Sequence, residues 1–373
     1  MIKRIILEQV EKCFFKQRAI IIYGARQVGK TTLIRQLQEK YTDSVYLNCD
    51  EPDVRNALTD KSSTELHGLA GKHKVVFIDE AQRVKNIGLT LKLFVDNFPK
   101  LQIVATGSSS LDLSNVIKEP LTGRKFEFHL YPFSLMELGG ECSEIELKRL
   151  LERRMLYGMY PAAINAPEDA EMILKELSSS YLYKDVLQYQ NIKRPEILEK
   201  LLLHLAFQIG SEVSYNELAG KLGVNKQTVA NYIDLLEKSF VIFSLGPFSR
   251  NLRNELTKMR KIYFYDTGIR NSLIQNYNSV EFRSDTGVLW ENFIIAERMK
   301  YNSLCQRYVN AYFWRTYQQQ EIDYLEDSQG KLGGFEFKWK SGKNVRAPKA
   351  FAESYPGATV ETITPGNFLR WLT

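Results

Sequence analysis

The sequence predicts a multidomain α/β protein, with a parallel-sheet domain first, a helical and winged-helix middle, and a second α/β domain last. Three observations favour this architecture. The apolar run 19–22 is followed by a glycine-rich loop and then by residues with helical spacing. Apolar runs within 74–80 and 101–106 end in polar residues, as buried parallel strands do. The 373 residues are enough for two to four domains of about 100–200 residues each.

The composition is that of an ordinary globular protein, with 44% hydrophobic and 25% charged residues. The net charge of +6 permits a nucleic-acid partner without requiring one. The four cysteines lie far apart and away from the four histidines, so we expect neither a disulfide framework nor a structural zinc site. No apolar run approaches the ~18 residues of a membrane span, and the first residues are too charged for a signal peptide. We therefore expect a cytoplasmic protein without a membrane partner.

The most specific pattern lies at residues 24–31, which fit G-x-x-x-x-G-K-[ST] between a strand and a helix. Its glycines permit a tight turn whose N–H groups face a phosphate chain, and the helix N-terminus adds positive potential. Lys30 is placed to reach the β- and γ-phosphates, and the Thr31 hydroxyl to hold Mg²⁺. We therefore expect ATP and Mg²⁺ to bind here. The expected binding residues are Gly24, Ala25, Arg26, Gln27, Val28, Gly29, Lys30, Thr31 and Thr32.

Two acids end the predicted strand at 74–80. Ligands of parallel sheets bind beyond the carboxyl ends of the strands, so Asp79 is expected beside the phosphate loop. It is suited to bind Mg²⁺, directly or through water, and Glu80 to polarise the attacking water. The alternative is an exposed acidic turn after a core strand, which the spacing of about 50 residues from Lys30 disfavours.

Two further polar segments are candidates for the same site. Ser108 follows the predicted strand 101–106 and is the first candidate for orienting the water, with Thr106 second; the alternative is a serine-rich turn that caps the next helix. Arg124 precedes the predicted strand 126–131 and is a candidate for approaching the γ-phosphate, from the same chain or from a neighbour. A plain surface arginine is the alternative.

These segments, together with residues 130–138, resemble the prokaryotic AAA-type P-loop ATPases related to the archaeal ATPase and STAND groups. The resemblance implies Walker A at Lys30 and Thr31, Walker B at Asp79 and Glu80, and a sensor at Ser108. A Gly-Arg pair such as the one ending at Arg124 is a hallmark of the family. For residues 1–138 it implies a P-loop NTPase fold in which hydrolysis drives a conformational switch, and oligomerisation is compatible with it.

The middle of the chain is expected to be helical. Residues 1–18 predict a short basic amphipathic helix before the first strand, and 139–200 a helical lid or linker broken at 158–161. Residues 201–250 have helix-turn-helix spacing: Ser214 starts one helix with a capping box to Glu217, Asn225 caps the next, and 241–245 forms a wing strand. The outer face carries Lys226, Gln227 and Asn231, which suit either DNA contact or, if the module only packs domains together, solvent.

Residues 251–373 carry a second set of charged groups. Glu291 lies on a predicted helix, Asp323 on the strand 321–325, and Glu336 and Lys338 on one face of the strand 333–340. The segment resembles a C-terminal domain of unknown function that follows this ATPase module, and the order of the four groups resembles the restriction-endonuclease-like PD-(D/E)xK core. That core implies Mg²⁺ at Asp323 and Glu336 and water activation by Lys338.

Other interpretations of this last domain stay open. A charged edge strand or an inactive domain of the same fold are alternatives, and Ile322-Asp323 replaces the usual Pro-Asp pair. A basic stretch at 249–261 suits nucleic acid or a solvated connector. Three functions follow: an ATPase switch, an ATP-regulated nuclease, and a nucleotide-dependent regulator that binds DNA.

Overall fold

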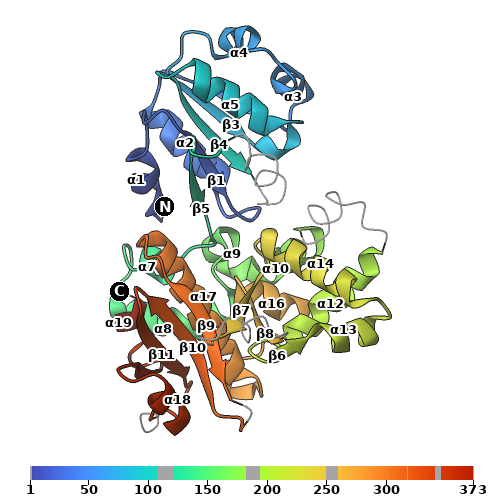
Figure 1. Cartoon of the computed structure of the whole chain (residues 1–373), viewed down its shortest axis with the longest axis vertical. Coiled ribbons are helices and arrows are strands. Elements are labelled where there is room, and N and C mark those ends of the chain that lie inside the picture. Colours follow the sequence, from blue (N-terminus) through green and yellow to red (C-terminus); the bar gives the residue numbers. More distant parts are fainter. Residues whose placement is uncertain are drawn as a thin grey trace.

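The chain folds into two lobes, each built on one sheet (Figure 1). The computed structural model describes residues 2–107, 121–181, 194–248, 259–316, 318–340 and 346–372. Within these ranges, one sheet has five strands and the other has seven. The five-stranded sheet belongs to the blue-to-teal part of the chain, and the seven-stranded sheet to the later residues.

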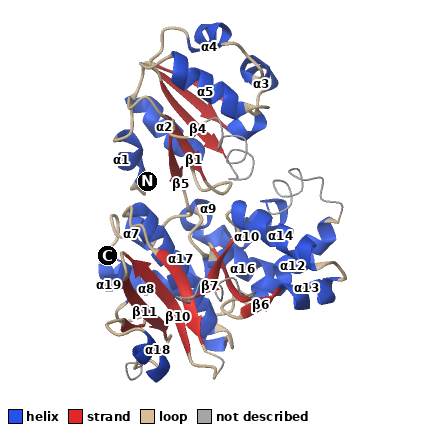
Figure 2. Cartoon of the chain, in the orientation of Figure 1, coloured by secondary structure: helices blue, strands red, loops and turns tan. Residues whose placement is uncertain are grey.

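The first sheet is fully parallel and runs in the order β2-β3-β4-β1-β5. Its strands are β1 (Ala19–Tyr23), β2 (Ser44–Asn48), β3 (Val75–Asp79), β4 (Gln102–Gly107) and β5 (Lys125–His129). The strands predicted at 19–22, 74–80, 101–106 and 126–131 are confirmed, with ends shifted by one or two residues. Residues of β1, β3 and β4 are buried throughout because helices pack around the sheet (Figure 2). These helices include α2 (Lys30–Lys40), α3 (Pro52–Leu58), α4 (Ser63–Ala70) and α5 (Ile87–Asn97), and the 3-10 turn η1 (Ala81–Arg83) follows β3.

The N-terminal helix is shorter than predicted. It covers only α1 (Ile6–Glu11) rather than most of residues 1–18. Beyond its end, Phe15 and Gln17 have φ of 57° and 55°, a left-handed backbone through which a right-handed helix cannot continue to residue 18. Ile6 and Val10 are buried, so α1 is held by packing against the first lobe.

The helical middle matches its predicted break. The 14-residue helix α8 (Glu144–Tyr157) ends at Gly158, whose φ is 68°, and Pro161 begins the next helix, α9. The other helices are α7 (Leu135–Leu138), α9 (Pro161–Asn165), α10 (Ala170–Glu176) and α12 (Pro195–Phe207), with a 3-10 turn η2 (Pro167–Asp169) and a π-helical turn η3 (Leu177–Tyr181).

Two capped helices follow, as the sequence predicts. Ser214 caps α13 (Tyr215–Leu222) by accepting a hydrogen bond from the N–H of Glu217, and Asn225 caps α14 (Lys226–Lys238). The expected capping box is only half formed. The carboxylate of Glu217 instead accepts a hydrogen bond from Lys221 at 2.5 Å.

The second sheet joins the middle of the chain to its C-terminal part, in the order β12-β11-β10-β9-β7-β8-β6. Its strands are β6 (Glu212–Ser214), β7 (Ile242–Pro247), β8 (Met259–Phe264), β9 (Asn310–Arg315), β10 (Glu321–Ser328), β11 (Lys331–Phe337) and β12 (Thr359–Ile363). The remaining helices are α16 (Thr267–Leu273), α17 (Thr286–Leu304), α18 (Lys349–Ser354) and α19 (Phe368–Leu372), with a 3-10 turn η4 (Val280–Phe282). Because β7 pairs with β9, the strands beside α13 and α14 and those of the last domain form one continuous sheet.

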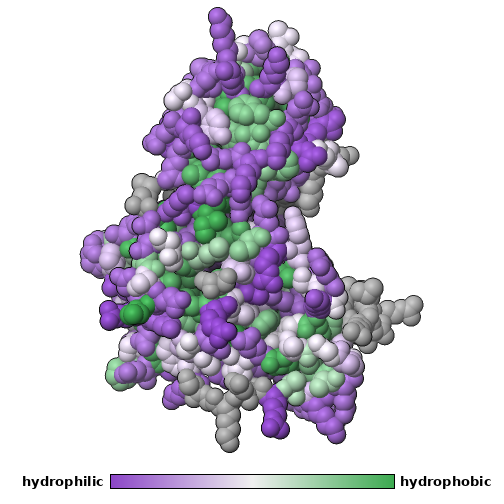
Figure 3. Space-filling view, turned by 90° about the vertical axis from the view of Figure 1, so that its left-hand side faces the viewer, coloured by the Kyte–Doolittle hydropathy of each residue, from purple (hydrophilic) through white to green (hydrophobic). Residues whose placement is uncertain are grey.

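The surface shows no broad apolar belt on the face that Figure 3 presents, where hydrophilic side chains separate smaller apolar patches. Within the described ranges, none of the helices combines the length and apolarity that a membrane crossing requires. The long helix α17 is buried along most of its length and forms the centre of the second lobe (Figure 1).

Candidate functional site

The phosphate loop connects β1 to α2 and depends on two glycines. A Cβ at Gly24 would lie 2.2 Å from the carbonyl oxygen of Leu130, so no larger residue fits there. Gly29 precedes α2 with a φ of 99°, which L side chains rarely adopt. The loop therefore needs glycine at both ends of its G-x-x-x-x-G pattern.

Lys30 folds into the loop. Its Nζ donates hydrogen bonds to the carbonyl oxygens of Gly24, at 2.9 Å, and Ala25, at 2.8 Å. The residue is 5% exposed. A buried ammonium on a curved backbone is a cation placed to meet phosphate oxygens that enter the loop.

Asp79 is the centre of the polar network at the ends of the strands. One carboxylate oxygen accepts hydrogen bonds from the hydroxyls of Thr31 and Tyr46, both at 2.8 Å, and the other accepts one from Thr106. Burial, together with the bond to Asp79, raises the pKa of Tyr46, so this phenol stays protonated and donating. The structure thus brings Thr31 and Asp79, the two expected Mg²⁺ ligands, into contact.

Glu80 lies next to this network in a strained conformation. Its φ of 52° is left-handed, which is uncommon for a non-glycine residue. Its N–H contacts Asp79 Oδ1 at 3.2 Å, and its carboxylate accepts a hydrogen bond from the side chain of Gln82.

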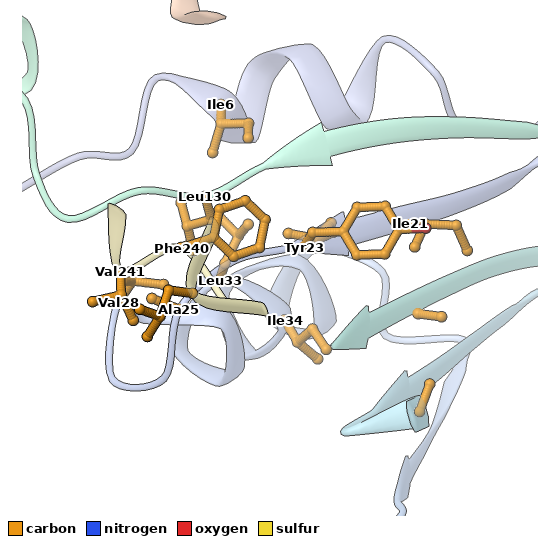
Figure 4. Close-up of a cluster of buried hydrophobic side chains, with 14 of the residues drawn as sticks. Ile6, Ile21, Tyr23, Ala25, Val28, Leu33, Ile34, Leu130, Phe240 and Val241 are labelled. Carbon is orange, nitrogen blue, oxygen red and sulfur yellow. The ribbon is translucent and has the colours of Figure 1, made fainter. Parts of the chain in front are cut away.

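Of these groups, Lys30, Thr31 and Glu80 line one open cavity of about 500 Å³, while Asp79 is buried behind Thr31. Its walls are Arg26, Gln27, Gly29, Lys30, Thr31, Thr32, Asp50, Glu80, Arg83, Pro161 and Ala162. Asp50 and Arg83 form an ion pair at 2.5 Å. Pro161 and Ala162 belong to α9. Of the expected binding residues, Gly24, Ala25 and Val28 do not line the cavity. Ala25 and Val28 are buried in the core beneath the loop (Figure 4).

The two candidates for orienting water have different outcomes. Ser108 lies outside the described residues. Thr106, the second candidate, is fully buried at the end of β4, where its Oγ1 also accepts a hydrogen bond from the N–H of Glu80 at 3.3 Å. Thr106 therefore connects Asp79 to Glu80.

Arg124 lies at the end of the sheet where β1 starts, whereas the phosphate loop follows the other end of that strand. Its carbonyl accepts a hydrogen bond from the N–H of Ala19, at the start of β1, whereas the loop follows Tyr23 at the end of that strand. Five strand residues span about 16 Å. Arg124 also pairs with Asp96 at 2.6 Å. This corrects the same-chain alternative: within one chain the arginine does not reach the loop, and only the neighbour alternative stays open.

The four C-terminal residues predicted to act together do converge. Lys338 Nζ lies 3.0 Å from Glu336 Oε2 and 4.0 Å from Asp323 Oδ2, and the N–H of Phe337 donates to Asp323 at 2.9 Å. Glu291 of α17 lies close enough to this group for its charge to act on Lys338 and for that of Asp323 to act on it. Burial raises the pKa of Glu291 to about 7, the cation of Lys261 opposes this, and the nearby Asp323 adds to the rise.

Two residues of β8 complete this cluster and were not predicted. Lys261, which is 2% exposed, pairs with Glu321 and lies 3.5 Å from Glu291. Tyr263 donates a hydrogen bond to Glu291 at 2.6 Å. The two lie two positions apart in β8, so strand alternation places them on one face, but nothing in the sequence tells which face meets Glu291.

The expectation of Mg²⁺ at Asp323 and Glu336 does not fit this arrangement. The ammonium of Lys261 pairs with the carboxylates of Glu291 and Glu321, and Lys338 pairs with Glu336. Within the described ranges, no group of three or more His, Cys, Asp or Glu side chains is arranged to hold a metal ion. The cluster is balanced by lysines, which occupy the carboxylates that a metal needs.

The expected DNA-reading residues lie on the surface of α14. Lys226, Gln227 and Asn231 are exposed, and the side chain of Gln227 donates to that of Asn231 at 2.8 Å. Val229 and Ile233 bury the opposite face, so the predicted division of the helix is confirmed. Most of the basic stretch, residues 249–258, lies outside the described residues.

Comparisons with known proteins match three segments of the chain, two of which have no assigned function. Residues 148–279 and 286–367 match two domains of unknown function, DUF8612 and DUF4143. Uncharacterized protein Rv2008c of Mycobacterium tuberculosis is 27% identical over 96% of this chain and 79% of its own length. Uncharacterized protein MJ1544 of Methanocaldococcus jannaschii is 26% identical over 79% of this chain and 69% of its own.

Among solved structures, the Walker-type ATPase PABY2304 of Pyrococcus abyssi is similar with a TM-score of 0.48 and 17% identity, over 72% of this chain and 93% of that chain. Residues 16–139 match the family described as AAA domain, and these are the residues that carry the phosphate loop, Asp79 and Glu80. The chain therefore carries an AAA-type P-loop ATPase domain of the prokaryotic kind that its motifs resemble, joined to a C-terminal domain of unknown function.

Proposed function

We propose that Mg²⁺-dependent ATP hydrolysis in the AAA domain drives a conformational switch that reaches the C-terminal lobe. The observation that carries the proposal is the position of the phosphate loop. Its upper side faces the cavity with Lys30 and Thr31, while Ala25 and Val28 on its underside pack beside Phe240 of the second lobe (Figure 4). One short loop therefore both lines the expected phosphate site and packs against the second lobe.

The residues present fit a magnesium ion bound with the nucleotide. Hydroxyl and carboxylate oxygens are the ligands that Mg²⁺ prefers, and Thr31 and Asp79 offer both within 2.8 Å of each other. When bound, the ion neutralises charge on the β- and γ-phosphates. Lys30 leaves its backbone carbonyls to bind the same phosphates, and Tyr46 keeps Asp79 oriented.

Glu80 orients the water that attacks the γ-phosphate in line. Its backbone is fixed by hydrogen bonds of its N–H to Asp79 and Thr106. The side chain is held by Gln82, which it must leave, or rotate around, to meet the water. Hydrolysis then detaches the γ-phosphate from the nucleotide in the loop. The loop changes conformation, and this change is passed to the second lobe.

Residues of the second lobe contact the phosphate loop and the cavity, so a movement of the loop would reach that lobe. Phe240 and Val241 are buried in the core cluster that also contains Ala25 and Leu33, and Phe240 has a left-handed φ of 59°. Pro161 of α9 lines the cavity itself. Because Phe240 is bulky and lies in a strained turn under the loop, we expect it to move when the loop moves.

Two variants and one exchange measurement test this proposal. Glu80→Gln should keep ATP binding and lose turnover, whereas Lys30→Ala should lose both. Hydrogen exchange of the amides at 236–241 should differ between the ATP-bound state of Glu80→Gln and the ADP-bound wild type. Normal turnover in Glu80→Gln would contradict the role of Glu80 in orienting water. Identical hydrogen exchange in the two states would contradict the proposed conformational switch.

A second candidate function is nucleotide-dependent DNA binding by α14. The observation in its favour is the exposed polar face that includes Lys226 and Gln227 at the start of the helix. We expect salt-dependent binding to duplex DNA, weakened by Lys226→Ala with Gln227→Ala, if this face contacts DNA. Equal binding by the double variant would leave α14 as a packing element. We propose no metal-dependent cleavage at the C-terminal cluster, because lysines occupy its carboxylates.

A further inference from the structure

Arg4 lies at the phosphate loop although it precedes the AAA match at 16–139. The residue is 6% exposed. Its guanidinium donates one hydrogen bond to the carbonyl oxygen of Val28 and another, at 3.0 Å, to the carboxylate of Glu137. The same group lies over the ring of Phe133, 3.9 Å from its centroid. A buried arginine thus joins the loop to the chain that follows β5.

The contact with Val28 fixes a peptide plane of the loop. The carbonyl of Val28 and the N–H of Gly29 belong to one trans peptide and point in opposite directions. A donor that holds the carbonyl therefore turns the N–H away from Arg4. Gly29 lines the nucleotide cavity and precedes α2, whose first N–H groups have no partner within the helix. Such N–H groups are the donors that bind phosphate.

Glu137 connects this contact to the second lobe. Its carboxylate also accepts hydrogen bonds from the N–H groups of Ser134, at 3.0 Å, and Ile5, at 3.3 Å. The N–H of Leu135 in α7 donates to Glu297 of α17 at 2.6 Å. A chain of buried polar contacts therefore runs from the loop through Arg4 and α7 to the central helix of the C-terminal lobe.

We propose that Arg4 is a positioning residue for nucleotide binding: it holds the Val28 carbonyl so that the Gly29 N–H faces the phosphates, and it makes this geometry depend on the docking of α7 and α17. The inference rests on the proposed function of the loop and adds the route by which the C-terminal lobe regulates it. Arg4 itself does not line the cavity, so it acts through the loop.

The test compares Arg4→Gln with Gln9→Ala. Gln9 lies in α1 and donates to the carbonyl of Leu304 at the end of α17, so its loss loosens the same N-terminal segment without touching the loop. ADP affinity, measured with a fluorescent ADP analogue in the full chain, should fall about tenfold in Arg4→Gln, which corresponds to about 1.4 kcal/mol. Gln9→Ala should stay within about twofold of the wild type. Arg4→Lys, which keeps the charge but reaches one partner at a time, should be intermediate.

Two outcomes overturn the proposal: unchanged ADP affinity in Arg4→Gln, or an equal loss in Gln9→Ala. If Arg4→Gln does not fold, Glu137→Gln replaces it, and there unchanged affinity at an unchanged unfolding temperature also overturns the proposal. Because the readout is ADP binding, it stays separate from turnover. A wild type that binds ADP but does not hydrolyse ATP would refute the proposed hydrolysis, while the comparison of affinities would still decide the role of Arg4.

Discussion

The nucleotide site and the C-terminal cluster gather acidic residues in a similar way but surround them differently. At the end of β3, Asp79 is held by the hydroxyls of Thr31, Tyr46 and Thr106. In the C-terminal lobe, Glu291 faces the ammonium of Lys261. Hydroxyls leave the carboxylate charge available to a cation that arrives with a ligand, whereas a buried ammonium already balances it before any ligand arrives. The neighbours, more than the acids, decide which site can take a metal.

The strongest test of this comparison exchanges one aspartate at each site for asparagine. Asp79→Asn should lower ATP turnover by at least about a thousandfold, because it removes the charge that holds the metal. Asp323→Asn, the matched variant in the other lobe, should leave turnover within about twofold. ATP hydrolysis at saturating Mg²⁺ measures both. A comparable loss in the two variants would show that the C-terminal cluster takes part in hydrolysis, and the two sites would then not differ in the way proposed.

A second test removes the lysine that separates the two kinds of site. Lys261→Met should lower the free energy of unfolding by about 3 kcal/mol, because Glu291 and Glu321 lose their buried partner. Magnesium or calcium should then raise the unfolding temperature of this variant but not that of the wild type at the same concentrations. Chemical denaturation and thermal melts measure the two effects. The exposed Lys349→Met should change stability by less than about 0.5 kcal/mol. A variant as stable as the wild type would mean that Lys261 does not neutralise the cluster.

The parts of this molecule that depend on local patterns were predictable, and those that depend on distant pairing were not. The central strands β1, β3 and β4 are mostly apolar runs followed by polar residues, and the phosphate loop is a contiguous motif. Arg4, by contrast, contacts Val28 and Glu137, which lie 24 and 133 positions away. Nothing near Arg4 in the sequence distinguishes it from a surface arginine.

The second sheet was harder to predict for the same reason. β6 has only three residues, too few for a periodic signal, and β12 has polar residues at exposed and buried positions alike. The pairing of β7 with β9 joins segments more than 60 residues apart, so the shared sheet is invisible to local patterns. Four groups of the C-terminal cluster were found from their order along the chain, with strand alternation pairing only Glu336 and Lys338, but Lys261, which decides the chemistry of the cluster, came from another strand.

A third test asks whether the loop of the nucleotide site is as tightly built as the Asp79 network suggests. Gly24→Ala should lower the free energy of unfolding by about 2 kcal/mol, because its Cβ would lie 2.2 Å from the Leu130 carbonyl. Nucleotide affinity should fall with it. Gly287→Ala in α17 has no atom within 4 Å of the new Cβ and should be neutral or slightly stabilising. Denaturant titration compares the two. Equal stability in both variants would show that the loop adapts more freely than these contacts imply.

The smallest expected effect concerns the pH dependence of the C-terminal cluster. Burial, with the charge of Asp323, raises the pKa of Glu336 to about 7 from its ordinary value of 4.5. Between these values the folded chain keeps a proton that the unfolded chain has released, so the contribution of this group to stability falls as pH rises through 7.

Glu336→Gln, which mimics the protonated acid, should therefore match the wild type at pH 5 and exceed its stability by about 1 kcal/mol at pH 8. Unfolding free energies at the two pH values measure the difference, and the exposed Glu353→Gln should keep the wild-type slope. If Glu336→Gln differed from the wild type in unfolding free energy by the same amount at both pH values, Glu336 would lie in an ordinary solvated environment. It would also weaken the contrast with Asp79, because the C-terminal acids would then be as open to an arriving cation as the nucleotide site is.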